Sequence, residues 1–191
     1  MENLSITKVK RICTPEYVWY AAYGSNLLRS RFLCYINGLA PTENHRAHAG
    51  CRDSSDPVWD LAARCEYPVV FAGERSSWGE GGVAFLDVEG SGVETPLRLW
   101  KVTREQFEDV CAMENGLLPG AVTIDFGSLC SRGTMVVAEQ GWYGLGAFLG
   151  DFEGDPVVTF TWQDRRIDLN NPSERYAGVI SEGKVEILWD R

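Results

Sequence analysis

A turn of three small polar residues, Gly24, Ser25 and Asn26, offers the first chemistry in this sequence. Residues 18–23 before it are apolar or aromatic and carry no charge, which predicts a buried strand, and residues 27–36 after it predict an amphipathic helix. We expect Gly24 to adopt backbone angles that a side chain forbids, and Ser25 or Asn26 to cap the helix. The unpaired N–H groups of such a turn point to one place, which suits a carboxylate or a developing oxyanion. A capped turn without a ligand is the alternative.

A glutamate at the end of a second predicted helix is the candidate acid or base. Thr103 is placed to begin this helix as its N-cap, and Gln106 completes a capping box. Asn115 and Gly116 predict where it ends, so Glu114 lies in its last turn. There the negative end of the helix dipole and a neighbouring apolar face oppose ionisation of the carboxylate. A raised pKa suits a general base or acid near neutral pH; an exposed glutamate without a role is the alternative.

The cysteines and histidines offer little chemistry by their spacing. The six cysteines form no Cys-x-x-Cys pair, and we expect most of them to be free, buried thiols. His45 and His48, followed by Cys51, would supply at most three zinc ligands from a loop-like segment. We therefore expect incidental surface histidines and predict no metal site.

Composition and charge narrow the class of partner. A chain of 191 residues predicts one domain with a sizeable core. The net charge of −9 and the absence of a basic stripe argue against nucleic acid and against an anionic membrane surface. No apolar run approaches the roughly 20 residues that cross a bilayer, and the first residues do not resemble a signal peptide. We expect a cytoplasmic protein whose partner is a small molecule.

The remaining elements follow from the apolar pattern and its turn residues. Residues 67–72 and 83–88 predict two strands that pair antiparallel across a glycine-rich turn. A further helix opens at Pro172 and is expected to end at Gly183. Other strands are expected at residues 95–102, 122–126, 134–139, 141–149, 157–162 and 185–189.

These elements have no βαβ rhythm, so they predict an α+β fold in a single domain. We expect mixed strands curled into a partial β-barrel, with about three helices packed outside. Residues 1–16 are expected to form an irregular lead-in to a domain at 17–191, and residues 39–66 a long loop.

Three segments, in order, resemble the γ-glutamylcyclotransferase-like family. Residues 23–27, Tyr-Gly-Ser-Asn-Leu after an apolar strand, resemble its signature loop. Residues 102–116 resemble the region of its catalytic glutamate, which follows a strand ending in Val-Thr and a short helix; here that glutamate is Glu114. Residues 172–183 resemble its late helix with a Pro-Ser-x-x-Tyr opening, and the glycine-rich residues 78–83 resemble the strand that leads toward the glutamate.

The resemblance implies an intramolecular transfer. The α-amine of a γ-glutamyl unit attacks its own γ-carbonyl, and 5-oxoproline and a free amine are released. Glu114 would move the protons, and Tyr176 would offer a hydroxyl at the pocket edge. No cofactor or metal is implied. The implied substrate-binding residues of the turn are Tyr23, Gly24, Ser25, Asn26 and Leu27.

The sequence also departs from the family pattern. The loop at 39–66, an added hairpin at 89–94, and Phe160 and Trp162 in place of a tyrosine all bear on the pocket wall. The resemblance therefore predicts the type of reaction, but these differences leave the identity of the leaving amine open. It leaves the oligomeric state open.

Two alternatives remain open. One is a non-catalytic small-ligand-binding protein of the same fold. The other is a hydrolase with a cysteine nucleophile served by His45 or His48, which needs a cysteine at a turn or a helix N-terminus. Cys34 and Cys111 fall late in predicted helices, whereas position does not exclude Cys51 and Cys65.

Overall fold

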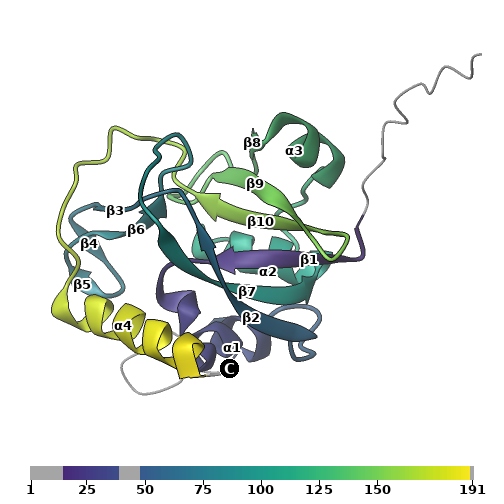
Figure 1. Ribbon diagram of the computed structural model, residues 1–191, viewed down its shortest axis with the longest axis horizontal. Coiled ribbons are helices and arrows are strands. Elements are labelled where there is room, and N and C mark those ends of the chain that lie inside the picture. Colours follow the sequence, from purple (N-terminus) through teal and green to yellow (C-terminus); the bar gives the residue numbers. More distant parts are fainter. Residues whose placement is uncertain (1–14, 39–47, 190–191) are drawn as a thin grey trace, which may run out of the picture.

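The computed structural model describes residues 15–38 and 48–189. Most of the expected lead-in, the first part of the long loop and His45 lie outside these ranges. A six-stranded mixed sheet forms the centre of the fold, in the order β2-β7-β1-β10-β9-β8 (Figure 1). Its strands are β1 (Tyr17–Ala22), β2 (Trp59–Cys65), β7 (Thr95–Thr103), β8 (Thr134–Val136), β9 (Leu145–Phe152) and β10 (Asp155–Thr161). The sheet curls without closing, because β2 and β8 remain its edges.

Strand β1 lies in the middle of the sheet, parallel to β10 and antiparallel to β7. Its side chains alternate between two hydrophobic clusters, as the period of a strand requires. Val18, Tyr20 and Ala22 belong to one cluster. Trp19 and Ala21 belong to the other. Both faces of the strand are therefore buried, which explains why its sequence carries no charge.

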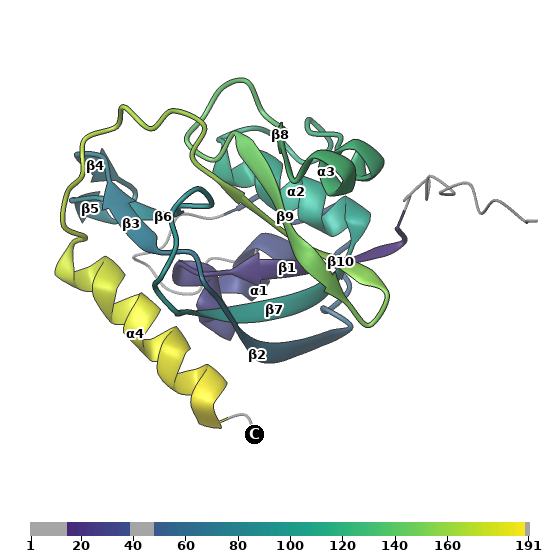
Figure 2. The same ribbon diagram turned by 45° about the horizontal axis from the view of Figure 1, so that its top comes forward.

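Different elements cover the two faces of the sheet (Figure 2). One face packs against α1 (Arg29–Asn37), α2 (Arg104–Glu114) and α3 (Phe126–Arg132). The other packs against the hairpin of β3 (Val69–Ala72) and β6 (Val83–Leu86) and against α4 (Glu174–Trp189). A small hairpin, β4 (Arg75–Ser76) with β5 (Gly79–Glu80), connects β3 to β6. The connection from β10 passes around this hairpin to reach α4 (Figure 1).

The α+β fold and the antiparallel pairing of β3 with β6 are confirmed. The strand expected at residues 122–126 is wrong. Asp125 caps α3 there, because its carboxylate accepts from the Ser128 amide at 3.0 Å and ends the extended backbone. The described part of the expected loop contains β2. The helix count within the described residues is four rather than three.

The strand expected at residues 185–189 is also wrong, since α4 continues through Gly183. This glycine is needed for close packing. A Cβ there would lie 2.6 Å from the amide nitrogen of Leu28 and 2.7 Å from the carbonyl carbon of Leu27. Gly183 thus lets α4 approach the chain that follows β1, and it does not end the helix.

Two glycines of α4 give a matched prediction. Gly183→Ala is expected to lower the free energy of unfolding by about 1–3 kcal/mol, because its methyl group overlaps backbone atoms. Gly178 is exposed, and a Cβ there meets no described atom within 4 Å. Gly178→Ala should therefore raise the free energy of unfolding by roughly 0.5–1 kcal/mol through helix propensity. Urea denaturation measures both; a stabilising Gly183→Ala would contradict the packing argument.

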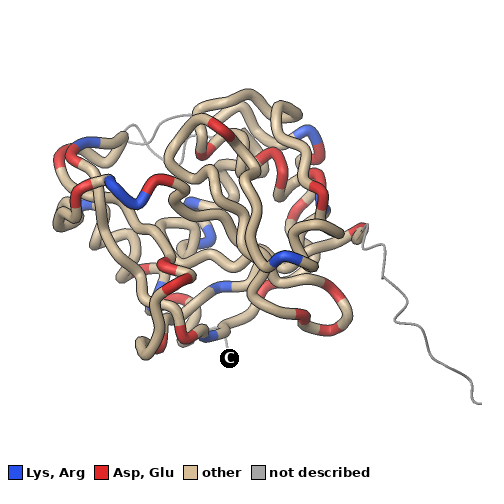
Figure 3. Tube along the Cα trace, turned by 90° about the horizontal axis from the view of Figure 1, so that it is seen from above, with Lys and Arg blue, Asp and Glu red and all other residues tan. Residues whose placement is uncertain are grey.

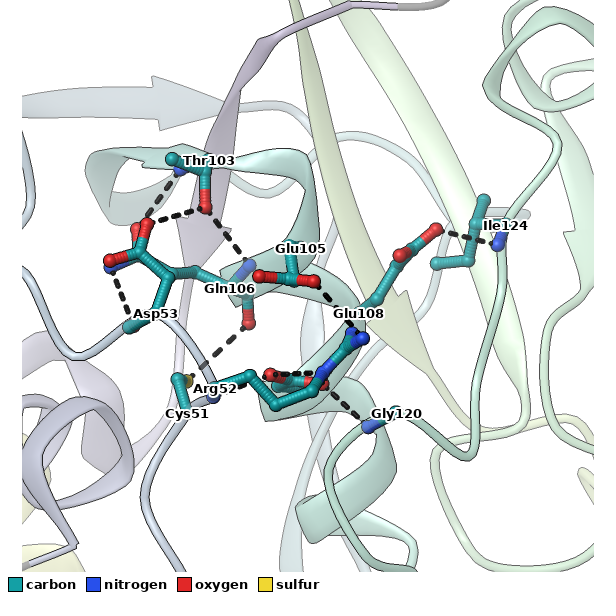
Figure 4. A network of polar contacts seen from close by, with 10 residues as sticks. Cys51, Arg52, Asp53, Thr103, Glu105, Gln106, Glu108, Gly120 and Ile124 are labelled. Carbon is teal, nitrogen blue, oxygen red and sulfur yellow. Dashed lines mark hydrogen bonds and ion pairs between the residues drawn. The ribbon is translucent and has the colours of Figure 1, made fainter.

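A polar network fixes the first half of α2 (Figure 4). The predicted capping box is confirmed: Thr103 Oγ1 accepts from the Gln106 amide at 3.1 Å, and Gln106 Oε1 accepts from the Thr103 amide at 3.0 Å. The buried carboxylate of Asp109 accepts from the amides of Arg52 at 2.9 Å and Gly120 at 2.7 Å. The direction of α2, and with it the position of Glu114 at its other end, is set by these contacts.

Candidate active site

A cavity of about 360 Å³ lies beyond the end of β1. Its wall combines the turn at 23–26 with residues of α1, the end of α2, the β4–β6 region, the loop at 141–143 and α4. Glu114, Tyr23, Gly24, Ser25, Asn26 and Tyr176 all line it. Segments far apart in the sequence therefore meet in one hollow.

The turn differs in detail from the expectation. Residues Ser25–Leu27 form a 3-10 turn, η1, and neither Ser25 nor Asn26 caps α1. Leu28 occupies the N-cap position without a side-chain bond. The cap comes instead from α4, where Glu186 Oε2 accepts from the Arg29 amide at 3.0 Å. A tertiary contact thus supplies what the local sequence predicted.

Gly24 is also required for a different reason than expected. Its φ is −109°, so the turn does not need a left-handed residue there. A Cβ at this position would lie 3.1 Å from the hydroxyl oxygen of Tyr176. That hydroxyl accepts from the Ala84 amide at 3.3 Å and is also hydrogen-bonded to the backbone of Ser25. Gly24 therefore makes room for the tyrosine that holds the turn against β6.

Leu27 is the one sequence-predicted residue that the structure does not bring to the cavity wall. Its side chain is fully buried in the core beneath α4. Its amide donates to the carbonyl of Gly24 at 3.1 Å, and its carbonyl accepts from Arg98 at 3.1 Å. Leu27 supports the turn from behind.

Glu114 contacts the turn directly in the cavity wall. Its Oε1 accepts from the Asn26 side-chain amide at 3.1 Å, and the same Nδ2 donates to the Tyr20 hydroxyl at 3.1 Å. Burial raises the pKa of Glu114 above its ordinary value of 4.5. The Arg31 cation and hydrogen bonds from Tyr35 and Asn26 lower this pKa in part. The pKa of Glu114 is shifted in the predicted direction, and burial is the largest cause.

Sequence reasoning missed the cationic side of the cavity. Arg31, from α1, lines it with only 5% of its surface exposed. Its Nη2 donates to the Tyr35 hydroxyl at 3.0 Å, and its Nη1 lies 2.9 Å from His48 Nε2. The sequence feature that could have identified Arg31 is its place on α1, one turn before Tyr35 and beside Phe32, where a charge interrupts the apolar face of the helix.

His48 is therefore not an incidental surface histidine, and that expectation is wrong. It is partly buried, lines the cavity and packs against Tyr35 in a tilted arrangement with ring centroids 3.8 Å apart. Because a guanidinium only donates, Nε2 of His48 accepts from Arg31 and its ring proton lies on Nδ1.

Asn115 fixes the opposite wall. Its Oδ1 accepts from the Tyr143 amide at 2.9 Å, and its Nδ2 donates to the Tyr143 carbonyl at 3.1 Å. The Tyr143 hydroxyl in turn donates to the Ala84 carbonyl at 3.1 Å. The loop at 141–143 is thus tied to both α2 and β6. The sequence predicted Asn115 only as the end of the helix.

The described cysteines stay away from the cavity wall. Burial raises the pKa of Cys51 to about 12 and also raises the pKa of Cys65, so neither favours a thiolate. This argues against the cysteine-hydrolase alternative. Among the described residues, no cluster of three His, Cys, Asp or Glu side chains is arranged to hold a metal.

Charges on the described surface are mixed. Figure 3 shows Lys and Arg interspersed with Asp and Glu, without a continuous basic stripe along the described trace. In the described part of the chain, no helix is long and apolar enough to span a membrane.

Two solved structures resemble this one closely enough to show its fold. An uncharacterised human protein aligns with a TM-score of 0.53 and 18% identity, over 90% of this chain and 80% of that chain. A gamma-glutamyl cyclotransferase aligns with a TM-score of 0.53 and 18% identity, over 91% of this chain and 82% of that one. The chain therefore has the γ-glutamylcyclotransferase-like fold, as the sequence resemblance predicts.

The sequence itself matches part of a longer protein. It is 33% identical over 189 residues to histone deacetylase 5 of Arabidopsis thaliana, and the match covers 88% of this chain. The chain spans 28% of that protein's length. No protein-family model matches the chain.

Proposed function

We propose that the protein is a γ-glutamyl cyclotransferase that acts on a small γ-glutamyl amine or peptide. The substrate's α-amine nitrogen forms a bond to its own γ-carbonyl carbon, and the bond from that carbon to the leaving nitrogen breaks. The products are 5-oxoproline and a free amine. The observation that carries this proposal is the 3.1 Å hydrogen bond between Glu114 and Asn26 in the wall of one cavity.

Glu114 has the position and the pKa direction of a proton shuttle. The attacking nitrogen gives up two protons as the ammonium becomes the lactam N–H, and the leaving nitrogen takes up two as it departs as an ammonium ion. Glu114 would carry protons between the two nitrogens, so no proton is gained or lost overall. Burial keeps its pKa nearer to neutral pH than that of an exposed glutamate, and a carboxylate near the pH of the reaction serves both steps.

The turn at 23–26 would bind the oxygen of the tetrahedral intermediate through backbone N–H groups. Tyr176 holds this turn in place through its contacts with Ser25 and Ala84. Because both reacting groups belong to one molecule, the cavity mainly has to hold the substrate folded for attack. Its volume of about 360 Å³ is suitable for a small metabolite.

A substrate panel tests this function. We expect at least one γ-glutamyl amine, γ-glutamyl amino acid or glutathione-type peptide to yield stoichiometric 5-oxoproline, detected by mass spectrometry. Trp78 and Trp142 line the cavity and favour a leaving group that packs on aromatic rings. Ligand binding without any 5-oxoproline would favour the non-catalytic binding protein. If no ligand binds and no product forms, both the enzyme and the binding protein are overturned.

The proposal also predicts the pH dependence. The value of kcat/KM should rise along an acid limb with a midpoint above 4.5, because Glu114 must be ionised and burial raises its pKa. Tyr35→Phe removes a hydrogen bond that lowers this pKa, so the limb should move to higher pH. Burial raises the pKa of Tyr20 and Tyr35 well above 10, so these two neighbours do not titrate in this range.

Tyr67→Phe, outside the cavity wall, is the control and should leave the profile unchanged. A Tyr35→Phe profile identical to that of the wild type would remove Glu114 as the group that controls the acid limb.

A further inference from the structure

The cavity wall carries one permanent cation and one carboxylate. Arg31 stands on the side of α1, and Glu114 stands at the end of α2. The other titratable residues of the wall are His48, which accepts a hydrogen bond from Arg31, and a group of tyrosines. The tyrosines are Tyr20, Tyr23, Tyr35, Tyr143 and Tyr176, and burial raises the pKa of each, so they remain neutral.

Arg31 is buried without an ion-pair partner. Within the described residues, no salt bridge within 4.0 Å joins its guanidinium to a carboxylate. Its contacts include the His48 ring nitrogen, the Tyr35 hydroxyl, the Cys34 thiol and two aromatic faces, and Glu114 is the carboxylate whose charge acts on it. Its Nε has no hydrogen-bond partner. Burying a cation in this way is costly, and a bound anion at hydrogen-bonding distance would offset that cost.

Asn26 presents an unsatisfied acceptor beside Glu114. Its Oδ1 is buried and has no hydrogen-bond partner. The orientation of the amide follows from chemistry, since an ionised Glu114 only accepts and therefore must face Nδ2. A ligand group that donates hydrogen bonds would satisfy Asn26 Oδ1 and Glu114 together. Two residues of the cavity wall thus hold a buried, unpaired polar atom: the donor Nε of Arg31 and the acceptor Oδ1 of Asn26, next to Glu114.

We propose that Arg31 binds the α-carboxylate of the substrate, while Asn26 and Glu114 receive its α-ammonium group. A γ-glutamyl unit carries both groups on one carbon, so it matches the two charged walls. This inference rests on the proposed function and deepens it: Arg31 makes the cavity select zwitterionic γ-glutamyl compounds. It disfavours 4-aminobutanoyl amides, which have the same attacking amine and the same carbonyl but no α-carboxylate.

Paired substrates test the inference. Wild-type protein should turn over a γ-glutamyl anilide about 10- to 100-fold better, in kcat/KM, than the matching 4-aminobutanoyl anilide, which is the range expected for charge-assisted hydrogen bonds. Arg31→Met should bring this ratio close to one, mainly through KM. Arg31→Lys keeps the positive charge but loses the planar guanidinium that can donate two parallel hydrogen bonds to a carboxylate, so it should retain part of the substrate preference. A merely structural Arg31 would lower both rates together and keep the ratio.

Arg29→Met is the matched control. Arg29 also belongs to α1, but it pairs with Asp60 at 2.9 Å and is absent from the cavity wall. Its substitution should leave the substrate preference unchanged.

A binding arm separates this inference from the proposed function. Calorimetry with 5-oxoproline and pyrrolidin-2-one, which differ only in the carboxylate, requires no turnover. Wild-type protein should bind 5-oxoproline at least about tenfold tighter, and Arg31→Met should abolish the difference. Equal binding of the two lactams, binding of neither, or an unchanged difference in Arg31→Met would overturn the role of Arg31. Absence of 5-oxoproline formation together with carboxylate-selective binding would overturn catalysis alone.

Discussion

Glu114→Gln is expected to lower the rate of 5-oxoproline formation by about two to four orders of magnitude. The substitution keeps the size of the side chain and its reach toward Asn26, but it removes the group that accepts the ammonium proton. KM should change much less than kcat, because the loss falls on the chemical step. Steady-state kinetics with the best substrate of the panel measures this effect.

Glu105→Gln is the control for Glu114→Gln. Glu105 belongs to the same helix but is half exposed and pairs with Arg52 at the surface at 3.0 Å. The Glu105→Gln variant should retain wild-type turnover. Near wild-type turnover in Glu114→Gln would remove Glu114 from the mechanism, whatever the fold.

Arg98→Met is expected to lower the free energy of unfolding by about 3–5 kcal/mol. Arg98 is 1% exposed on β7; its Nε donates to Asp60 at 2.7 Å and its Nη1 lies 3.2 Å from Glu186. Removing the cation takes away the buried partner that Asp60 and Glu186 share, and Asp60 keeps only its half-exposed pair with Arg29. The substitution also removes the donor to the Leu27 carbonyl, so activity should fall as well. Chemical denaturation at neutral pH measures the stability loss.

Arg64→Met provides the comparison for Arg98→Met. Arg64, on β2, pairs with Glu94 at 2.9 Å, and both side chains are more than half exposed. Its loss should cost less than about 1 kcal/mol, as is usual for surface pairs. A similar loss of stability in the two variants would show that the ion pairs of Arg98 with Asp60 and Glu186 do not support the turn.

The parts of the fold that the sequence predicted are those fixed by local pattern. Strand β1 follows from an uncharged run that is buried on both faces, and α2 follows from its capping box. The wrong end of the last helix and the wrong cap of α1 arose where a tertiary contact prevailed. Gly183 reads as a helix end in the sequence, but in the fold it lets α4 pack against Leu27 and Leu28.

The site divides in the same way. Glu114 and the turn at 23–26 have recognisable local sequence patterns, so the sequence predicted them as site residues. Arg31 and His48 do not, because their roles arise only when α1 and the segment after residue 47 converge on one cavity. A single sequence shows a charge on an apolar helix face. It does not show which other residue will meet that charge.

Isotope labelling tests the central claim most directly: that this cavity closes a γ-glutamyl unit on itself. A substrate whose α-amine carries ¹⁵N is incubated with the protein, and the products are separated by mass spectrometry. The account predicts that the label enters the ring nitrogen of 5-oxoproline and that the released amine is unlabelled. Labelled glutamate in place of 5-oxoproline would show attack by water, and an unconsumed panel of γ-glutamyl substrates would contradict catalysis altogether.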